Sequence, residues 1–98
     1  MELYRGDTFG RNIIIKNYEL QNDDIIKVGI KKRVSDDEYV LPLKILTNGE
    51  TSFVYTAEET KNLIPDTYIL EIELTYNTNE VGTLAQYSLT VKEDVIHD

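Results

Sequence analysis

The chain has 98 residues, with 10 Lys and Arg against 18 Asp and Glu and a formal net charge of −8 at pH 7. This acidic balance argues against nucleic-acid binding, because phosphate contacts need clustered basic side chains. The absence of cysteine excludes disulfide bonds, thiol nucleophiles and cysteine-ligated metals. The length suits a single domain spanning residues 1–98.

Neither a targeting segment nor a membrane span is expected from the sequence. Met1 is followed by Glu2 and Leu3 and not by a basic region with an apolar stretch behind it, so we expect no secretory signal. Apolar runs stay well short of the ~20 residues that span a bilayer. These observations predict a soluble protein with no membrane partner.

The first half of the chain alternates apolar and polar residues in short runs, as half-buried strands do. Pro42 cannot donate a backbone hydrogen bond, so its strand is expected at a sheet edge or a bulge. Asn48-Gly49 predicts a tight turn, since both residues tolerate positive φ. The expected strands cover residues 8–9, 12–16, 26–31, 39–46 and 51–56.

One helix is expected in the middle of the chain. Thr56 and Glu59 match a capping box, in which each side chain bonds the backbone N–H of the other residue. Pro65 cannot continue a helix. The pattern therefore predicts a short helix from about Ala57 to Leu63.

The second half predicts two long strands. Residues 68–76 and 85–92 both alternate apolar with polar side chains, which indicates one face on a core. The polar segment Asn77 to Gly82 joins them and favours an antiparallel hairpin. Frequent short strands with a single helical crossover predict an all-β fold.

The stretch after the helix favours an immunoglobulin-like antiparallel β-sandwich of about seven strands. In such folds a short helical turn crosses between the sheets, and a tyrosine then anchors the crossover through its hydroxyl. Tyr68 follows the expected helix at the right place, with Leu63 before it and Leu70 on the same face. The alternative is that Tyr68 is an ordinary strand tyrosine. We expect Val28 across the core from Leu70, and Tyr39 or Leu41 as the central plug.

Candidate catalytic and ligand-binding residues are few, and each has a simpler interpretation. His97 is the only histidine and lies next to the last residue. Arg5-Gly6-Asp7 matches an integrin-binding tripeptide but is expected to be a turn. Glu71 and Glu73 share a flat strand face, which offers no cleft for acid–base chemistry. We therefore expect no catalytic residues.

Charged clusters and tyrosines are the remaining candidates for binding sites. The acidic groups 23–24 and 36–38 carry oxygen ligands suited to calcium, but they fall at opposite ends of one strand and are expected to be solvated turns. The basic group 27–33 is flanked by those acidic residues and is expected to form a solvated strand face. A sugar-binding tyrosine platform is the alternative to core packing for Tyr55, Tyr68, Tyr76 and Tyr87. No cofactor or metal site is expected.

Four segments carry a family resemblance: RGDTFGRNIIIKN, DIIKVGIKK, AEETKNLIPDTYILEIELTY and AQYSLTVKEDV. Together they resemble the small immunoglobulin-like domains of phage and prophage virion proteins, in particular the N-terminal domain of phage baseplate upper proteins. Asp66-Thr67 stands where that group has a small glycine before the tyrosine, which departs from its pattern.

The resemblance implies a structural, non-enzymatic assembly role, with other virion or assembly subunits as partners. It also implies a location in the host cytoplasm during assembly and then in the virion. The strand holding Pro42 and the N-terminal strand are the edges expected to dock partners by strand addition. Homo-oligomerisation stays open, and a carbohydrate-binding or adhesive module is the alternative function.

Overall fold

The computed structural model describes residues 1–76 and 80–93. Its elements are β1 (Glu2–Tyr4), β2 (Phe9–Asn12), β3 (Ile25–Lys31), β4 (Lys44–Leu46), β5 (Ser52–Tyr55), α1 (Ala57–Thr60), β6 (Asp66–Thr75) and β7 (Val81–Lys92). The prediction of an all-β fold with one short helix is confirmed. Part of the connection predicted at 77–82, and His97, lie outside the described residues.

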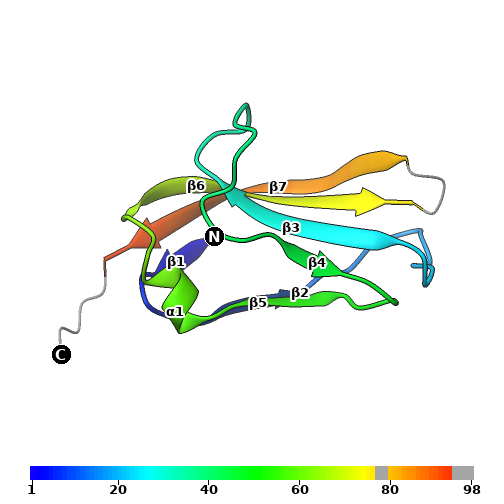
Figure 1. Cartoon of the computed structure of the whole chain (residues 1–98), viewed down its shortest axis with the longest axis horizontal. Coiled ribbons are helices and arrows are strands. Elements are labelled where there is room, and N and C mark those ends of the chain that lie inside the picture. Colours follow the sequence, from blue (N-terminus) through cyan, green and yellow to red (C-terminus); the bar gives the residue numbers. More distant parts are fainter. Residues whose placement is uncertain (77–79, 94–98) are drawn as a thin grey trace.

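The strands form two sheets (Figure 1). The larger has the order β1-β7-β6-β3-β4, and the smaller pairs β2 with β5. All pairs are antiparallel except β1 with β7, which run parallel. The expectation of a wholly antiparallel arrangement is therefore wrong at β1, a three-residue strand too short to show alternation in the sequence.

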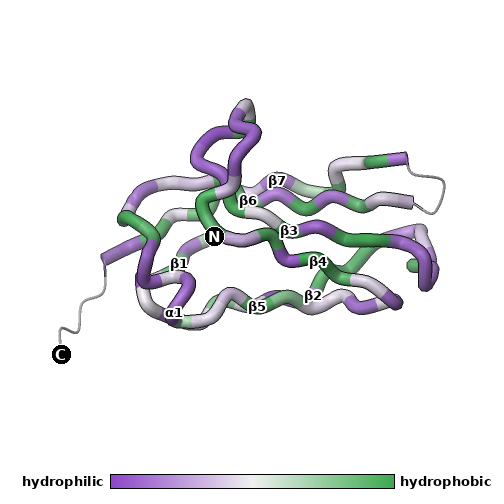
Figure 2. Tube along the Cα trace, in the orientation of Figure 1, coloured by the Kyte–Doolittle hydropathy of each residue, from purple (hydrophilic) through white to green (hydrophobic). Residues whose placement is uncertain are grey.

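The core lies between the two sheets and is built by strict alternation. On β6 the buried side chains Tyr68, Leu70, Ile72 and Leu74 face inward. From the smaller sheet, aromatic rings of β2 and β5 meet them, with Phe53 6.1 Å from Phe9 and 6.0 Å from the Tyr55 ring. Figure 2 shows the resulting alternation of hydrophobic and hydrophilic residues along the strands.

Two predicted strands are shorter or displaced. The run 39–46 forms a strand only over β4, and Pro42 lies in the exposed coil before it. The two N-terminal strands predicted at 8–9 and 12–16 are replaced by one strand, β2, which begins at Phe9 and ends at Asn12. After Asn12 the predicted alternation persists without strand pairing: Ile13 and Ile15 are partly buried against the core, and Ile14 between them is 80% exposed.

The helix α1 begins as its capping box predicts but ends early. The hydroxyl of Thr56 accepts from the Glu59 N–H, and the Glu59 carboxylate accepts from the Thr56 N–H. The helix stops at Thr60, three residues before the predicted end at Leu63. Leu63 is nevertheless buried in the core, so this turn still fastens the crossover from β5 to β6.

Two predicted core roles need correction. Val28 lies on β3 in the same sheet as Leu70, next to Ile72 of β6, and so does not face Leu70 across the core. Tyr39 is only partly buried, in the loop before β4, with its ring over Gly29 on the outer face of the sheet. The alternative candidate, Leu41, is buried in the core, where Tyr55 is the fully buried aromatic residue.

Candidate functional site

The crossover after α1 is held by one tyrosine hydroxyl. Tyr68, the third residue of β6, is 5% exposed. Its hydroxyl donates to the carbonyl of Ile64 at 2.6 Å, four residues upstream. This bond ties the start of a long strand to the loop that feeds it, and so fixes where β6 enters the larger sheet.

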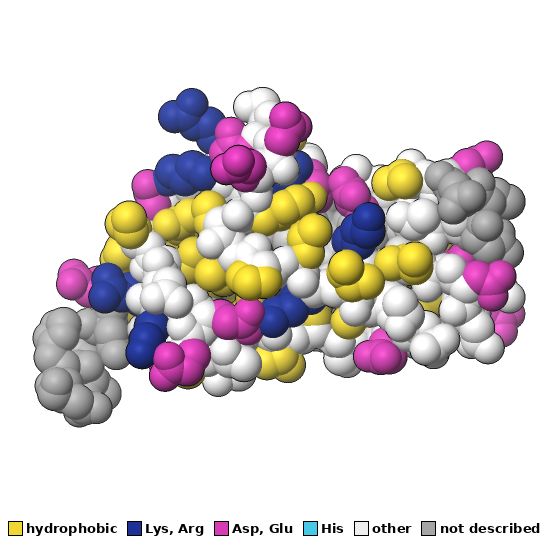
Figure 3. All heavy atoms as spheres, viewed as in Figure 1, with side chains coloured by type: hydrophobic (Ala, Val, Ile, Leu, Met, Phe, Trp, Pro, Cys, Tyr) yellow, Lys and Arg dark blue, Asp and Glu magenta, His cyan; other side chains and the backbone are white. Residues whose placement is uncertain are grey.

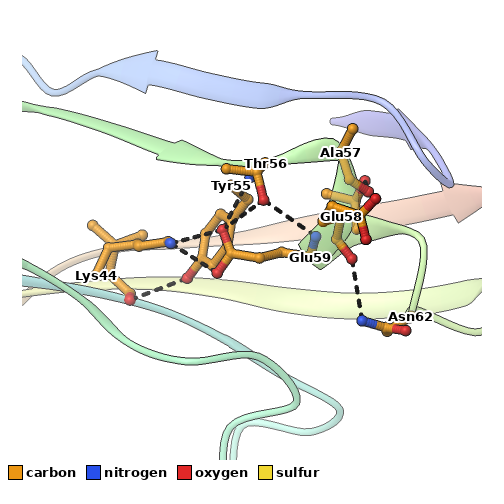
Figure 4. Close-up of polar contacts among 9 residues, drawn as sticks. Lys44, Tyr55, Thr56, Ala57, Glu58, Glu59 and Asn62 are labelled. Atoms are coloured by element: carbon orange, nitrogen blue, oxygen red, sulfur yellow. Dashed lines mark hydrogen bonds and ion pairs between the residues drawn. The ribbon is translucent and has the colours of Figure 1, made fainter.

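On the β4–β5 side the two sheets are tied together by polar contacts (Figure 4). The Lys44 Nζ of β4 lies 2.8 Å from both carboxylate oxygens of Glu59 in α1. Tyr55 passes between the sheets and donates its hydroxyl to the Val28 carbonyl at 3.2 Å. The Lys44 contact, together with the backbone N–H of Thr56, lowers the pKa of Glu59.

A second charged group is buried on the outer face of the larger sheet. Glu71 of β6 is 5% exposed, 3.2 Å from the Lys31 Nζ, and accepts from the Gln86 amide at 2.7 Å. Burial acts to raise the pKa of Glu71, but the contacts with Gln86 and Lys31 outweigh it and lower that pKa. A carboxylate held ionised between such partners suits sheet packing better than proton transfer near neutral pH.

The β7–β2 side of the molecule is open. A groove of about 390 Å³ runs between β7 and the segment from β2 to residue 16. Its floor and walls are mainly apolar: Ile13, Ile15, Phe53, Ile72, Ala85 and Tyr87. Its size lies in the ordinary range of ligand-binding cavities, roughly 300–1,000 Å³.

Two cations lie along this groove. Arg11 and Lys16 both line it. Arg11 stacks 4.6 Å from the Phe9 ring centroid and donates to the Gly10 carbonyl. Within the described part of the chain neither cation takes part in an ion pair, so both positive charges beside the groove are left for a ligand to neutralise.

Apolar side chains are also exposed around β4, at the opposite edge of the larger sheet. Figure 3 shows hydrophobic side chains gathered in a band across this face. Val40, Leu43 and Ile45 are 42%, 36% and 57% exposed. Exposed apolar side chains that cluster in this way mark interaction surfaces.

The other residues singled out in the sequence take structural places. Arg5-Gly6-Asp7 forms the turn between β1 and β2, where the Asp7 carbonyl accepts from the buried Thr60 hydroxyl at 2.6 Å. No group of acidic residues within the described ranges is arranged to hold a metal ion. Tyr55 and Tyr68 are buried in the core, which removes both from any sugar-stacking surface.

One buried polar pair is not apparent from the sequence. Asp24, expected in a solvated turn, is 2% exposed. It accepts from the Tyr18 hydroxyl and from the Gln21 N–H. The hydrogen bond to Asp24 raises the pKa of Tyr18 to about 12. The tyrosine six residues before the acid is the only sequence signal for this pairing.

Comparison with protein-family models, with curated proteins and with solved structures finds no match to this chain. Among the residues that the structure describes, no helix has the length and apolar character needed to cross a membrane. The assignment of function therefore depends on the surfaces described above and on the resemblance noted in the sequence.

Proposed function

We propose that this chain is a non-enzymatic assembly module of phage or prophage virions, with an immunoglobulin-like β-sandwich fold. The band of exposed apolar side chains around β4 is the observation that carries the binding role. A side chain such as Ile45, 57% exposed on an edge strand, gains apolar burial when a partner protein covers it.

Three structural features support the immunoglobulin-like part of the proposal. A short helix crosses from β5 in the smaller sheet to β6 in the larger one. The Tyr68 hydroxyl bonds back to the Ile64 carbonyl, as a tyrosine corner does. The last two long strands form a hairpin, with β3 alongside β6. The phage part rests on the sequence resemblance, and with it goes the proposal that the protein is in the host cytoplasm during assembly and then in the virion.

The two edges named from the sequence lie in different sheets. β4, which follows Pro42, is an outer strand of the larger sheet, and the N-terminal strand expected at 12–16 corresponds to β2, which is one of the two strands of the smaller sheet. Such strands carry unpaired backbone groups that a partner strand can complete. The burial of Tyr55 and Tyr68 favours protein binding over the carbohydrate-binding alternative.

Affinity capture from the source cells after prophage induction tests the proposal. Mass spectrometry of proteins captured by the tagged chain is expected to identify tail or baseplate subunits. Ile45→Glu should abolish the capture, whereas Val81→Glu, at a site 62% exposed at the far end of β7, should leave it unchanged. A chain that stays monomeric by light scattering and captures no virion subunit contradicts the proposal.

A further inference from the structure

The backbone edge of β7 is covered only at its end. β1 pairs with Thr90, Val91 and Lys92 (Figure 1). The Thr90 N–H donates to the Met1 carbonyl at 2.9 Å, and the Lys92 carbonyl accepts from the Arg5 N–H at 2.8 Å. The backbone groups of Thr90 and Lys92 therefore point toward β1.

Toward the start of β7 the backbone groups on this same edge of the strand are unpaired among the described residues. Backbone groups alternate in direction along a strand, so Ser88 and Gln86 point their N–H and C=O groups the same way as Thr90. Within the described residues no strand pairs with β7 on this side before Thr90. An edge with free donors and acceptors is ready to accept another strand.

This bare edge borders the apolar groove. Ala85 and Tyr87 of β7 line the groove and meet Ile13 and Ile15 across it. Exposed apolar surface continues onto the rim, where Tyr87 is 46% exposed. An added strand therefore finds both a hydrogen-bonding edge and a row of apolar contacts for every second side chain.

Charge limits which partner fits. Arg11 and Lys16 line the groove without an ion pair among the described residues, so an acidic group complements them. A second copy of this chain fits less well, because each copy has a net charge of −8 and the two repel. The groove thus favours a short extended segment with a local carboxylate.

We propose that β7 and the β7–β2 groove accept an extended segment of a partner protein as an added strand in line with β1. Alternate apolar side chains of that segment fill the groove, and a carboxylate pairs with Arg11 and Lys16. The inference rests on the proposed function in taking the occupant to be a protein, but it assigns a different surface from the β4 band.

Two synthetic ten-residue peptides test the inference by NMR titration of the full chain. Both alternate valine with threonine, and they differ only in having glutamate or lysine at both ends. The expected result is saturable binding of the glutamate-flanked peptide, with shift changes confined to β7, β2 and residues 13–16. The net charge of the whole chain alone favours the lysine-flanked peptide, so a preference for that peptide overturns the inference.

Substitutions separate the edge from the charges. Ser88→Pro removes one edge N–H and is expected to weaken binding about tenfold, the value of one hydrogen bond, while Ser88→Ala keeps the N–H and changes affinity by less than about twofold. Arg11→Glu should abolish the preference for the glutamate-flanked peptide. Lys27→Glu, the same charge change on β3 outside the groove, should preserve that preference.

The outcomes distinguish this inference from the proposed function. Absence of saturable binding, wild-type affinity in Ser88→Pro, or dimerisation through the groove without peptide overturns the strand-accepting inference. If virion subunits are still captured in that case, the proposed function stands and the β4 band carries it. Peptide binding at the groove without capture of any virion subunit leaves the inference supported and the proposed function contradicted.

Discussion

The two sides of this molecule differ, since the β4–β5 side is closed by side chains and the β7–β2 side is an open groove. On the β4–β5 side the fully buried Tyr55 links the two sheets through its bond to the Val28 carbonyl, and Lys44 of β4 is bonded to Glu59 of α1. On the β7–β2 side the smaller sheet has no further strand among the described residues, and Tyr87 is left 46% exposed above a groove. Residues of the same type are therefore structural on one side and available for binding on the other.

The largest expected effect comes from deleting equivalent aromatic side chains on the two sides. Tyr55→Ala should lower the free energy of unfolding by about 3–5 kcal/mol, because it opens a cavity in the closed side and leaves the Val28 carbonyl without its donor. Tyr87→Ala should cost less than about 1 kcal/mol, since the side chain is half exposed. Urea denaturation of both variants measures the difference, and equal losses contradict the comparison.

The crossover bond is expected to have the next largest effect. Tyr68→Phe keeps the buried ring but removes the hydroxyl that donates to Ile64, so the free energy of unfolding should fall by about 1–1.5 kcal/mol. Tyr4→Phe, at a site 41% exposed on β1, is the matched control and should be neutral. Denaturation curves of the two variants that coincide with the wild type would show that the crossover does not depend on this hydroxyl.

The smallest stability effect concerns Glu59 and depends on pH. Contact with Lys44 and the Thr56 N–H lowers the pKa of Glu59, so its stabilisation is fully present above the ordinary glutamate pKa and is lost as pH falls through the lowered value. Glu59→Gln preserves the capping geometry but removes the charge. It should cost on the order of 0.5–1 kcal/mol at pH 7, after allowance for partial exposure.

The pH series supplies the check on that prediction. As the pH falls through the lowered pKa of Glu59, the wild-type carboxyl takes up its proton, so the difference in free energy of unfolding between wild type and Glu59→Gln should shrink. Urea denaturation of both proteins at pH 7 and at a series of lower pH values measures this difference. A difference that stays constant or grows toward acid pH would show that Glu59 stabilises the protein by other means than its charge.

Local patterns predicted those parts of the fold that depend on neighbours in the sequence. The Thr56–Glu59 capping box marked the helix start, and the alternation from Tyr68 marked which face of β6 is buried. The position of Tyr68 after the helix also indicated where its hydroxyl bonds. In each case the signal and the contact lie within a few residues of one another.

Features that depend on distant pairing were not predictable in the same way. The parallel pairing of β1 with β7 joins residues almost a full chain length apart and leaves no local signal. Tyr39 follows the alternation of a strand, yet it lies in a loop over Gly29, because only a glycine leaves room there for its ring. The groove arises because one sheet has five strands and the other two, and the hydrophobic periodicity of a strand does not show to which sheet the strand belongs.

Amide hydrogen exchange along β7 tests the asymmetry of the two sides most directly. In the free chain the N–H groups of Ser88 and Gln86 face the bare edge and should exchange rapidly, while those of Tyr87 and Leu89 point toward β6 and should be protected. The glutamate-flanked peptide should then slow exchange at Ser88 and Gln86. Equal protection of all four amides in the free chain would contradict an open β7 edge.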